Sequence, residues 1–183
     1  MTTILTNLVT DEELTAAFDH VMAAPLNDGP VRLLCARPKP NARTYPQSLT
    51  LTRAHGVIGD FQMSQPWLEL PDGSPDPQIQ VSVLPFRSLD LCWRNRDNPR
   101  ATHPGDNIVT DMNLSYANVP TGSLLQAGTA VLRVSEEPND GCVKWCVFRS
   151  IRPLIPTTSG HLFRSIRPPV TRCREAVGWG YQI

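Results

Sequence analysis

The chain has 183 residues, with 17 basic and 17 acidic side chains and a formal net charge of zero. This length suits one domain with its own core, or one domain with a small appendage. The charge balance removes any general electrostatic attraction to nucleic acid or to an anionic membrane surface, so we expect neither as a partner.

The proline and cysteine content narrows the class of protein further. The 18 prolines disfavour long helices and are typical of short strands joined by turns. The five cysteines are an odd number, and the N-terminus lacks the basic and apolar regions of a signal peptide. We therefore expect reduced thiols in a cytoplasmic protein. Cys35 and Cys92 lie in apolar runs and are expected to be buried, and the cysteine spacing does not predict a zinc site.

The first predicted element is a helix that begins at Thr10. Thr10 and Glu13 have the spacing of a capping box. Apolar residues then recur at helical intervals, at Leu14, Ala17, Phe18, Val21 and Met22. Turn-forming residues follow this stripe up to residue 30. We expect residues 1–30 to form a helical extension that docks on the main body through its apolar face.

The rest of the chain, residues 31–183, carries short segments with the composition of strands. These segments cover residues 31–36, 48–52, 79–84, 129–135 and 178–183. Proline, glycine and aspartate turns lie between them, and no second helix has a clear apolar period. The pattern predicts a mainly β fold, a closed or nearly closed β-barrel with a few short helices.

The candidate site is centred on Cys142, which follows a strand-like segment and four turn-forming residues, 138–141. Gly141 permits a ligand to approach the backbone closely. If the chain is extended here, Cys142 and Lys144 point to the same face, and the ammonium group lowers the pKa of the thiol. A reactive thiolate is one interpretation, and a small buried apolar side chain is the other.

Five segments carry motifs in a recognisable order: residues 37–43, 56–60, 75–84, 104–114 and 122–145. Together they resemble the MOSC domain, named for the C-terminal domain of molybdenum-cofactor sulfurases, and most of all its stand-alone bacterial members. The resemblance extends from about residue 31 onward. It implies a MOSC-like β-barrel over residues 31–183 and a single functional cysteine, which maps onto Cys142.

The resemblance also implies a chemistry. In the family, that cysteine is thought to bind the molybdenum of a pterin cofactor or to carry sulfur, so Cys142 is both the catalytic and the metal-binding candidate. A thiolate is a soft ligand and can hold a persulfide sulfur. The expected cofactor is the molybdenum cofactor, molybdopterin, and N-hydroxylated small molecules are expected as substrates for reduction. A redox or sulfur-donor protein is the expected partner, and 183 residues leave no room for the pyridoxal-phosphate domain of the large sulfurases.

Other residues of these segments are candidates for cofactor binding, because guanidinium groups bind phosphate bidentately and backbone turns approach ligands closely. They are Arg37, Arg43, Arg53, Gly59, Asp60, Gln80, Asn107, Gly141 and Lys144. The three arginines have an alternative interpretation as solvated surface residues.

Two residues depart from the family pattern. Gln62 stands where many members have a basic residue or histidine, and Asp140 stands where threonine is expected. A carboxylate at position 140 opposes formation of a thiolate at Cys142. Two other functions therefore stay open. One is a non-catalytic β-barrel that binds a ligand or partner, with a vestigial Cys142. The other is a hydrolase or transferase that pairs Cys142 with a histidine, the candidates being His55, His103 and His161.

Overall fold

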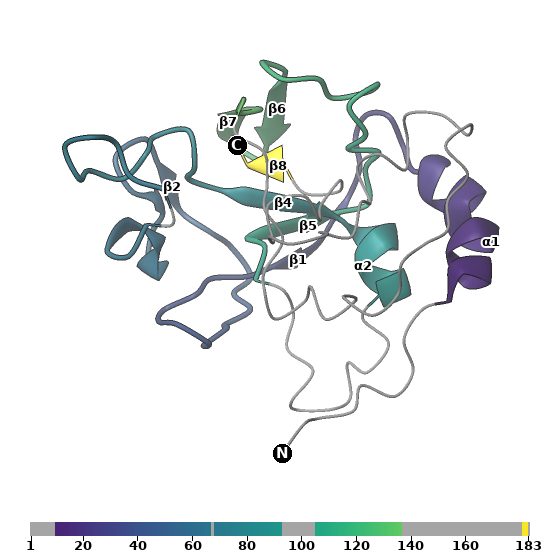
Figure 1. Ribbon diagram of the computed structural model, residues 1–183, viewed down its shortest axis with the longest axis horizontal. Coiled ribbons are helices and arrows are strands. Elements are labelled where there is room, and N and C mark those ends of the chain that lie inside the picture. The colour runs from purple at the N-terminus through teal and green to yellow at the C-terminus, as the bar shows by residue number, and fades with distance from the viewer. Residues whose placement is uncertain (1–9, 67, 93–104, 137–180, 183) are drawn as a thin grey trace.

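The computed structural model describes residues 10–66, 68–92, 105–136 and 181–182 (Figure 1). Its largest sheet has four strands in the order β1–β5–β4–β8. These strands are β1 (Val31–Leu34), β5 (Ile108–Thr110), β4 (Ser82–Pro85) and β8 (Tyr181–Gln182). Two further sheets have two strands each, β2 (Leu51–Thr52) with β3 (Gly56–Val57) and β6 (Leu124–Ala127) with β7 (Ala130–Arg133).

Helices are few and short. They are α1 (Asp11–Met22), α2 (Phe86–Cys92) and the 3-10 turn η1 (Phe61–Met63). The described part of the chain is therefore mainly β with a few short helices. Its strands form one larger sheet and two small ones, and within the described ranges they do not close into a barrel. Neither α-helix in these ranges is long and apolar enough to cross a membrane.

The central sheet is mixed. β1 and β8 pair antiparallel with their neighbours, whereas β4 and β5 run parallel. A parallel pair needs a crossover connection, and α2 begins directly after β4. The sequence does not predict α2, because its seven residues make only about two turns and show too little periodicity.

The predicted start of α1 is confirmed. The backbone N–H of Thr10 donates to Glu13 Oε2 at 2.8 Å, and the backbone N–H of Glu13 donates to Thr10 Oγ1 at 3.2 Å. The side chain of Val21 is buried, and α1 contacts α2 (Figure 1). Asn113 Nδ2 also donates to the backbone oxygen of Met22 at 3.0 Å. The C-terminal turn of α1 is thus attached to the main body.

The apolar core lies between the central sheet and the segments that follow β5. Val83 and Ile108 are paired across β4 and β5, and both are buried. Their buried neighbours in the cluster are Ala36, Val57, Val81, Leu114, Val119 and Val134. Each fully buried aliphatic side chain of this size contributes about 1.5–3 kcal/mol of hydrophobic stabilisation. This packing therefore fixes the positions of β4 and β5 relative to the segments that carry the other cluster residues.

Candidate functional site

The predicted centre of the site, with Gly141, Cys142 and Lys144, lies outside the described residues. Asp140, His103 and His161 also lie outside them. The other candidates can be placed, and they are Arg37, Arg43, Arg53, Gly59, Asp60, Gln80 and Asn107. Most of them lie around the ends of β1, β3, β4 and β5.

Arg37 and Asp60 form the central contact. Asp60 Oδ2 accepts hydrogen bonds from the backbone N–H of Arg37 at 3.0 Å and from Arg37 Nε at 2.8 Å. The side chain of Asp60 is only 2% exposed, so its charge requires this partner. The backbone N–H of Phe61 donates to the backbone oxygen of Arg37 at 2.7 Å, which joins the two segments directly.

The turn after β3 determines where Asp60 lies. Gly59 has φ +84°, a backbone conformation that glycine adopts without strain. Asp60 then acts as the N-cap of η1, because its Oδ1 accepts from the backbone N–H of Gln62 at 3.0 Å. One carboxylate thus organises both the arginine and the turn that follows.

Asn107 is fully buried and connects this contact to the sheet. Its Nδ2 donates to the backbone oxygen of Cys35 at 3.1 Å and to Asp60 Oδ2 at 3.0 Å. Its Oδ1 accepts from the backbone N–H of Ser82 at 3.1 Å. Since both amide protons and the amide oxygen are used inside the protein, Asn107 acts on a ligand only by positioning Asp60 and Arg37.

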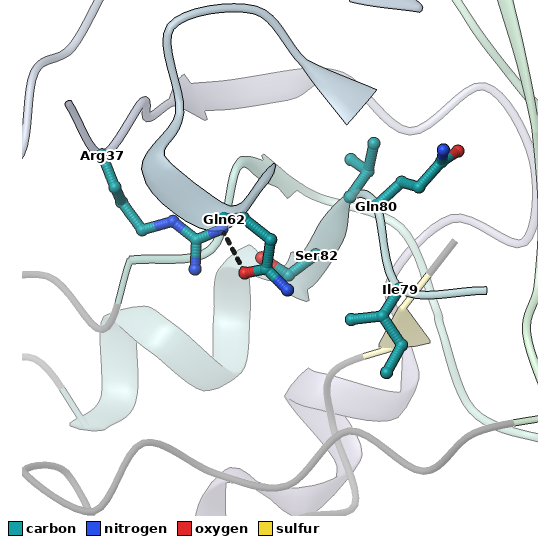
Figure 2. Close-up of a pocket in the computed structure, with 6 residues that line it drawn as sticks. Arg37, Gln62, Ile79, Gln80 and Ser82 are labelled. Carbon is teal, nitrogen blue, oxygen red and sulfur yellow. Dashed lines mark hydrogen bonds between the residues drawn. The ribbon is translucent and has the colours of Figure 1, made fainter. Parts of the chain in front are cut away.

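A shallow hollow lies beside this network (Figure 2). It spans about 170 Å³ including space open to solvent, of which only about 10 Å³ admits the centre of a water molecule, and it is lined by Arg37, Gln62, Ile79, Gln80, Val81 and Ser82. Gln62 Oε1 accepts from Arg37 Nη2 at 3.1 Å. Gln80 stands at the rim with its amide turned away from Arg37 in Figure 2, and its Nε2 donates to the backbone oxygen of Arg53 at 2.6 Å. The side chain of Arg53 is exposed and does not line the hollow.

Two further ionisable groups lie near Arg37 and were not proposed from the sequence. Burial raises the pKa of the Cys35 thiol to about 11, against the opposing effects of Arg43 and Arg37. Burial also raises the pKa of Asp106, and Arg37 is the strongest opposing charge. Cys35 therefore stays protonated at neutral pH and is a poor nucleophile.

Arg43 lies against the turn before β5. A Cβ placed on Gly105, which has φ +111°, would stand 2.9 Å from Arg43 Nε. Arg43 thus lies close to Asp106 and Cys35 without lining the hollow. Nothing in the local sequence singles out Ser82 or Asp106, because their partners come from distant segments.

No protein-family model, curated protein or solved structure matches this chain. The resemblance to the MOSC domain therefore stays a prediction. Among the residues that the structure describes, no group of three or more His, Cys, Asp and Glu side chains is arranged to hold a metal ion. A metal site as predicted needs Cys142.

Proposed function

We propose that this chain is a MOSC-type protein that binds the molybdenum cofactor, with Cys142 as the ligand of the metal or the carrier of its sulfur. One observation carries the proposal. Asp60 bonds Arg37 and Asn107, which lie 23 and 47 residues away in the chain, so three of the MOSC-like segments meet at the Asp60 carboxylate, and Arg37 also lines the hollow. A barrel completed by further strands is part of the same proposal.

The described residues fit only one end of such a cofactor. Pockets for whole ligands of this kind enclose roughly 300–1,000 Å³, which exceeds the space beside Arg37. Arg37 carries a guanidinium group that binds phosphate oxygens well, and Arg43 adds a second positive charge nearby. We therefore assign the phosphate end of the pterin to the Arg37 hollow. The bound molybdenum would supply the redox chemistry that reduces an N-hydroxylated substrate.

The hydrolase alternative receives no support from the described residues. His55 is exposed in the β2–β3 turn, where its backbone N–H donates to Thr52 Oγ1 at 3.1 Å. The buried, protonated Cys35 does not offer a substitute nucleophile. The alternative of a non-catalytic ligand-binding protein is retained as an outcome of the experiment.

The test is the substitution Cys142→Ser, with Cys146→Ser as the matched control four residues away. A hydroxyl is a hard ligand and a much weaker nucleophile than a thiolate, so molybdenum and persulfide content per chain should fall to background in Cys142→Ser only. Serine is close to cysteine in size, so we expect the free energy of unfolding to change by no more than about 1 kcal/mol.

Equal loading of wild type and Cys142→Ser would show that Cys142 is not the anchor. If the wild-type chain never loads when the cofactor is supplied in excess, the proposal fails and a non-catalytic ligand-binding protein becomes the better description. Asp140 makes this second result informative, because its carboxylate opposes the effect of Lys144 on the thiol.

A further inference from the structure

We propose that Arg37 and Gln62 form an oxyanion subsite in the hollow, and that Gln62 determines which ligands it accepts. The inference rests on the proposed function in one respect, because this subsite would receive the anionic end of the cofactor. Its chemistry, however, is independent of Cys142 and of molybdenum.

The orientation of Gln62 follows from a chain of hydrogen bonds. Arg37 Nε donates a hydrogen bond to Asp60 Oδ2, which fixes the guanidinium group. Arg37 Nη2 then donates to the side chain of Gln62 at 3.1 Å. A guanidinium group only donates, so the atom of Gln62 that it contacts must be the amide oxygen. Figure 2 shows the amide nitrogen of Gln62 on the side away from Arg37. Its N–H groups are therefore available to a ligand in the hollow.

The other polar groups of the hollow are already engaged. Ser82 Oγ lies 3.3 Å from Asn107 Oδ1 and accepts from the backbone N–H of Asn107 at 3.2 Å. Gln80 Nε2 donates to Arg53, and Ile79 and Val81 contribute only apolar surface. Within the described ranges, Arg37 Nη1 and Gln62 Nε2 have no protein acceptor. The hollow thus presents donors, which suit a ligand that only accepts hydrogen bonds.

Size and charge restrict the ligand further. Only about 10 Å³ of the hollow admits the centre of a water molecule, which is about the space of one water, so a small anion such as phosphate or sulfate would place one oxygen in it and stay partly exposed to solvent. Arg37 is already paired with the Asp60 carboxylate at 2.8 Å, so the subsite cannot rely on net charge alone. Directed N–H bonds from Gln62 then contribute a large share of the binding.

The substitution Gln62→Glu isolates this contribution. Glutamate has the same shape and can still accept the bond from Arg37 Nη2, so the local fold should be kept. It removes both N–H donors and adds a negative charge facing the ligand. Gln65→Glu is the matched control, because it makes the same charge change on an exposed side chain just after η1.

The experiment is a titration of the full chain, purified without cofactor, with inorganic phosphate, followed by calorimetry and by the 15N signals of glutamine side chains. We expect weak, saturable binding with a shift of the Gln62 Nε2 signal. Gln62→Glu should weaken binding at least about tenfold, because a bond to a charged ligand is lost and a repulsion gained. Gln65→Glu should change it less than about twofold. Unchanged melting of both variants shows that they fold.

Three results would overturn the inference: no phosphate binding, binding without a shift at Gln62, or equal weakening by the two variants. Phosphate binding that depends on Gln62, in a chain that never loads molybdenum, would contradict the proposed function and leave the subsite standing.

Discussion

Two carboxylates beside the central sheet, Asp111 and Asp60, are both bound to arginine, yet their surroundings differ. Asp111 accepts from Arg87 Nε at 2.7 Å and from Arg32 Nη2 at 3.2 Å. Arg87 also donates to the backbone oxygen of His20 at 2.6 Å, so this cluster ties α1 and α2 to β5. Asp60 instead holds one arginine whose outer edge faces a hollow. The first cluster directs its donors at the protein, and the second leaves donors for a ligand.

The pKa values of the carboxyl groups also differ between the two regions. Burial alone would raise the pKa of Asp111, but the hydrogen bonds from Arg87 and Arg32 outweigh it and hold the pKa below its usual range. Near Asp60, burial raises the pKa of Asp106 despite Arg37. A carboxylate held in an unfavourable environment is typical of functional sites, whereas a doubly paired one is typical of a structural clamp.

Asn107→Ala should produce the largest effect, because it breaks the support of the Asp60 region. The substitution leaves the backbone oxygen of Cys35, the backbone N–H of Ser82 and one bond of Asp60 without their buried partner. We expect a loss of about 3 kcal/mol in the free energy of unfolding, measured by urea denaturation. Phosphate affinity should fall as well, since Arg37 loses its orientation. A loss below about 0.5 kcal/mol would mean that Asn107 does not hold this network together.

Asp111→Asn should produce the next largest effect, because the amide cannot pair with both arginines. We expect a loss of about 2 kcal/mol near neutral pH, with phosphate affinity unchanged. The pKa of Asp111 is lowered on folding, so its contribution is present above the ordinary carboxyl value of 3.8 and is lost as pH falls through the lower folded pKa. The difference between wild type and variant should therefore shrink in acid, and a constant difference would contradict the assignment.

Asp106→Asn should change the free energy of unfolding in the opposite direction to Asp111→Asn, and by a smaller amount. A raised folded pKa means that ionised Asp106 opposes folding, so stability is lost as pH rises from 3.8 through the folded pKa. The variant should be more stable than wild type near neutral pH, by up to about 1 kcal/mol, and equal to it in acid. Urea denaturation across this pH range tests the sign, and a variant that is less stable at neutral pH would refute it.

The smallest expected effect is the alkylation of the Cys35 thiol, which should be slow. The side chain is 0% exposed and its pKa is about 11, so little thiolate forms near neutral pH. We expect Cys142 to be labelled first and Cys35 much later, as peptide mapping after timed alkylation would show. Should Cys35 react first, the placement of the site is wrong.

The sequence predicts the local features of this fold well. The capping box at Thr10 and Glu13 and the apolar stripe of α1 depend on neighbours three or four residues apart. The pairing of β4 with β5 and the role of Ser82 depend on residues 25 positions away, which no local pattern displays. In the sequence, Gln62 stands out only as a departure from the MOSC family pattern. Its proposed role follows from the bond to Arg37 Nη2, which only the structure shows.

The central position of β5 has a consequence for synthesis of the chain. β1 pairs only with β5 in the described sheet, and the bond between Asn113 and Met22 spans 91 residues. The N-terminal half therefore cannot complete its sheet until residues 108–113 have left the ribosome. Until then the apolar side of β1 and the stripe of α1 are exposed to other nascent chains. Contacts between residues so far apart in the sequence slow folding, and apolar surface that stays exposed in the meantime favours aggregation.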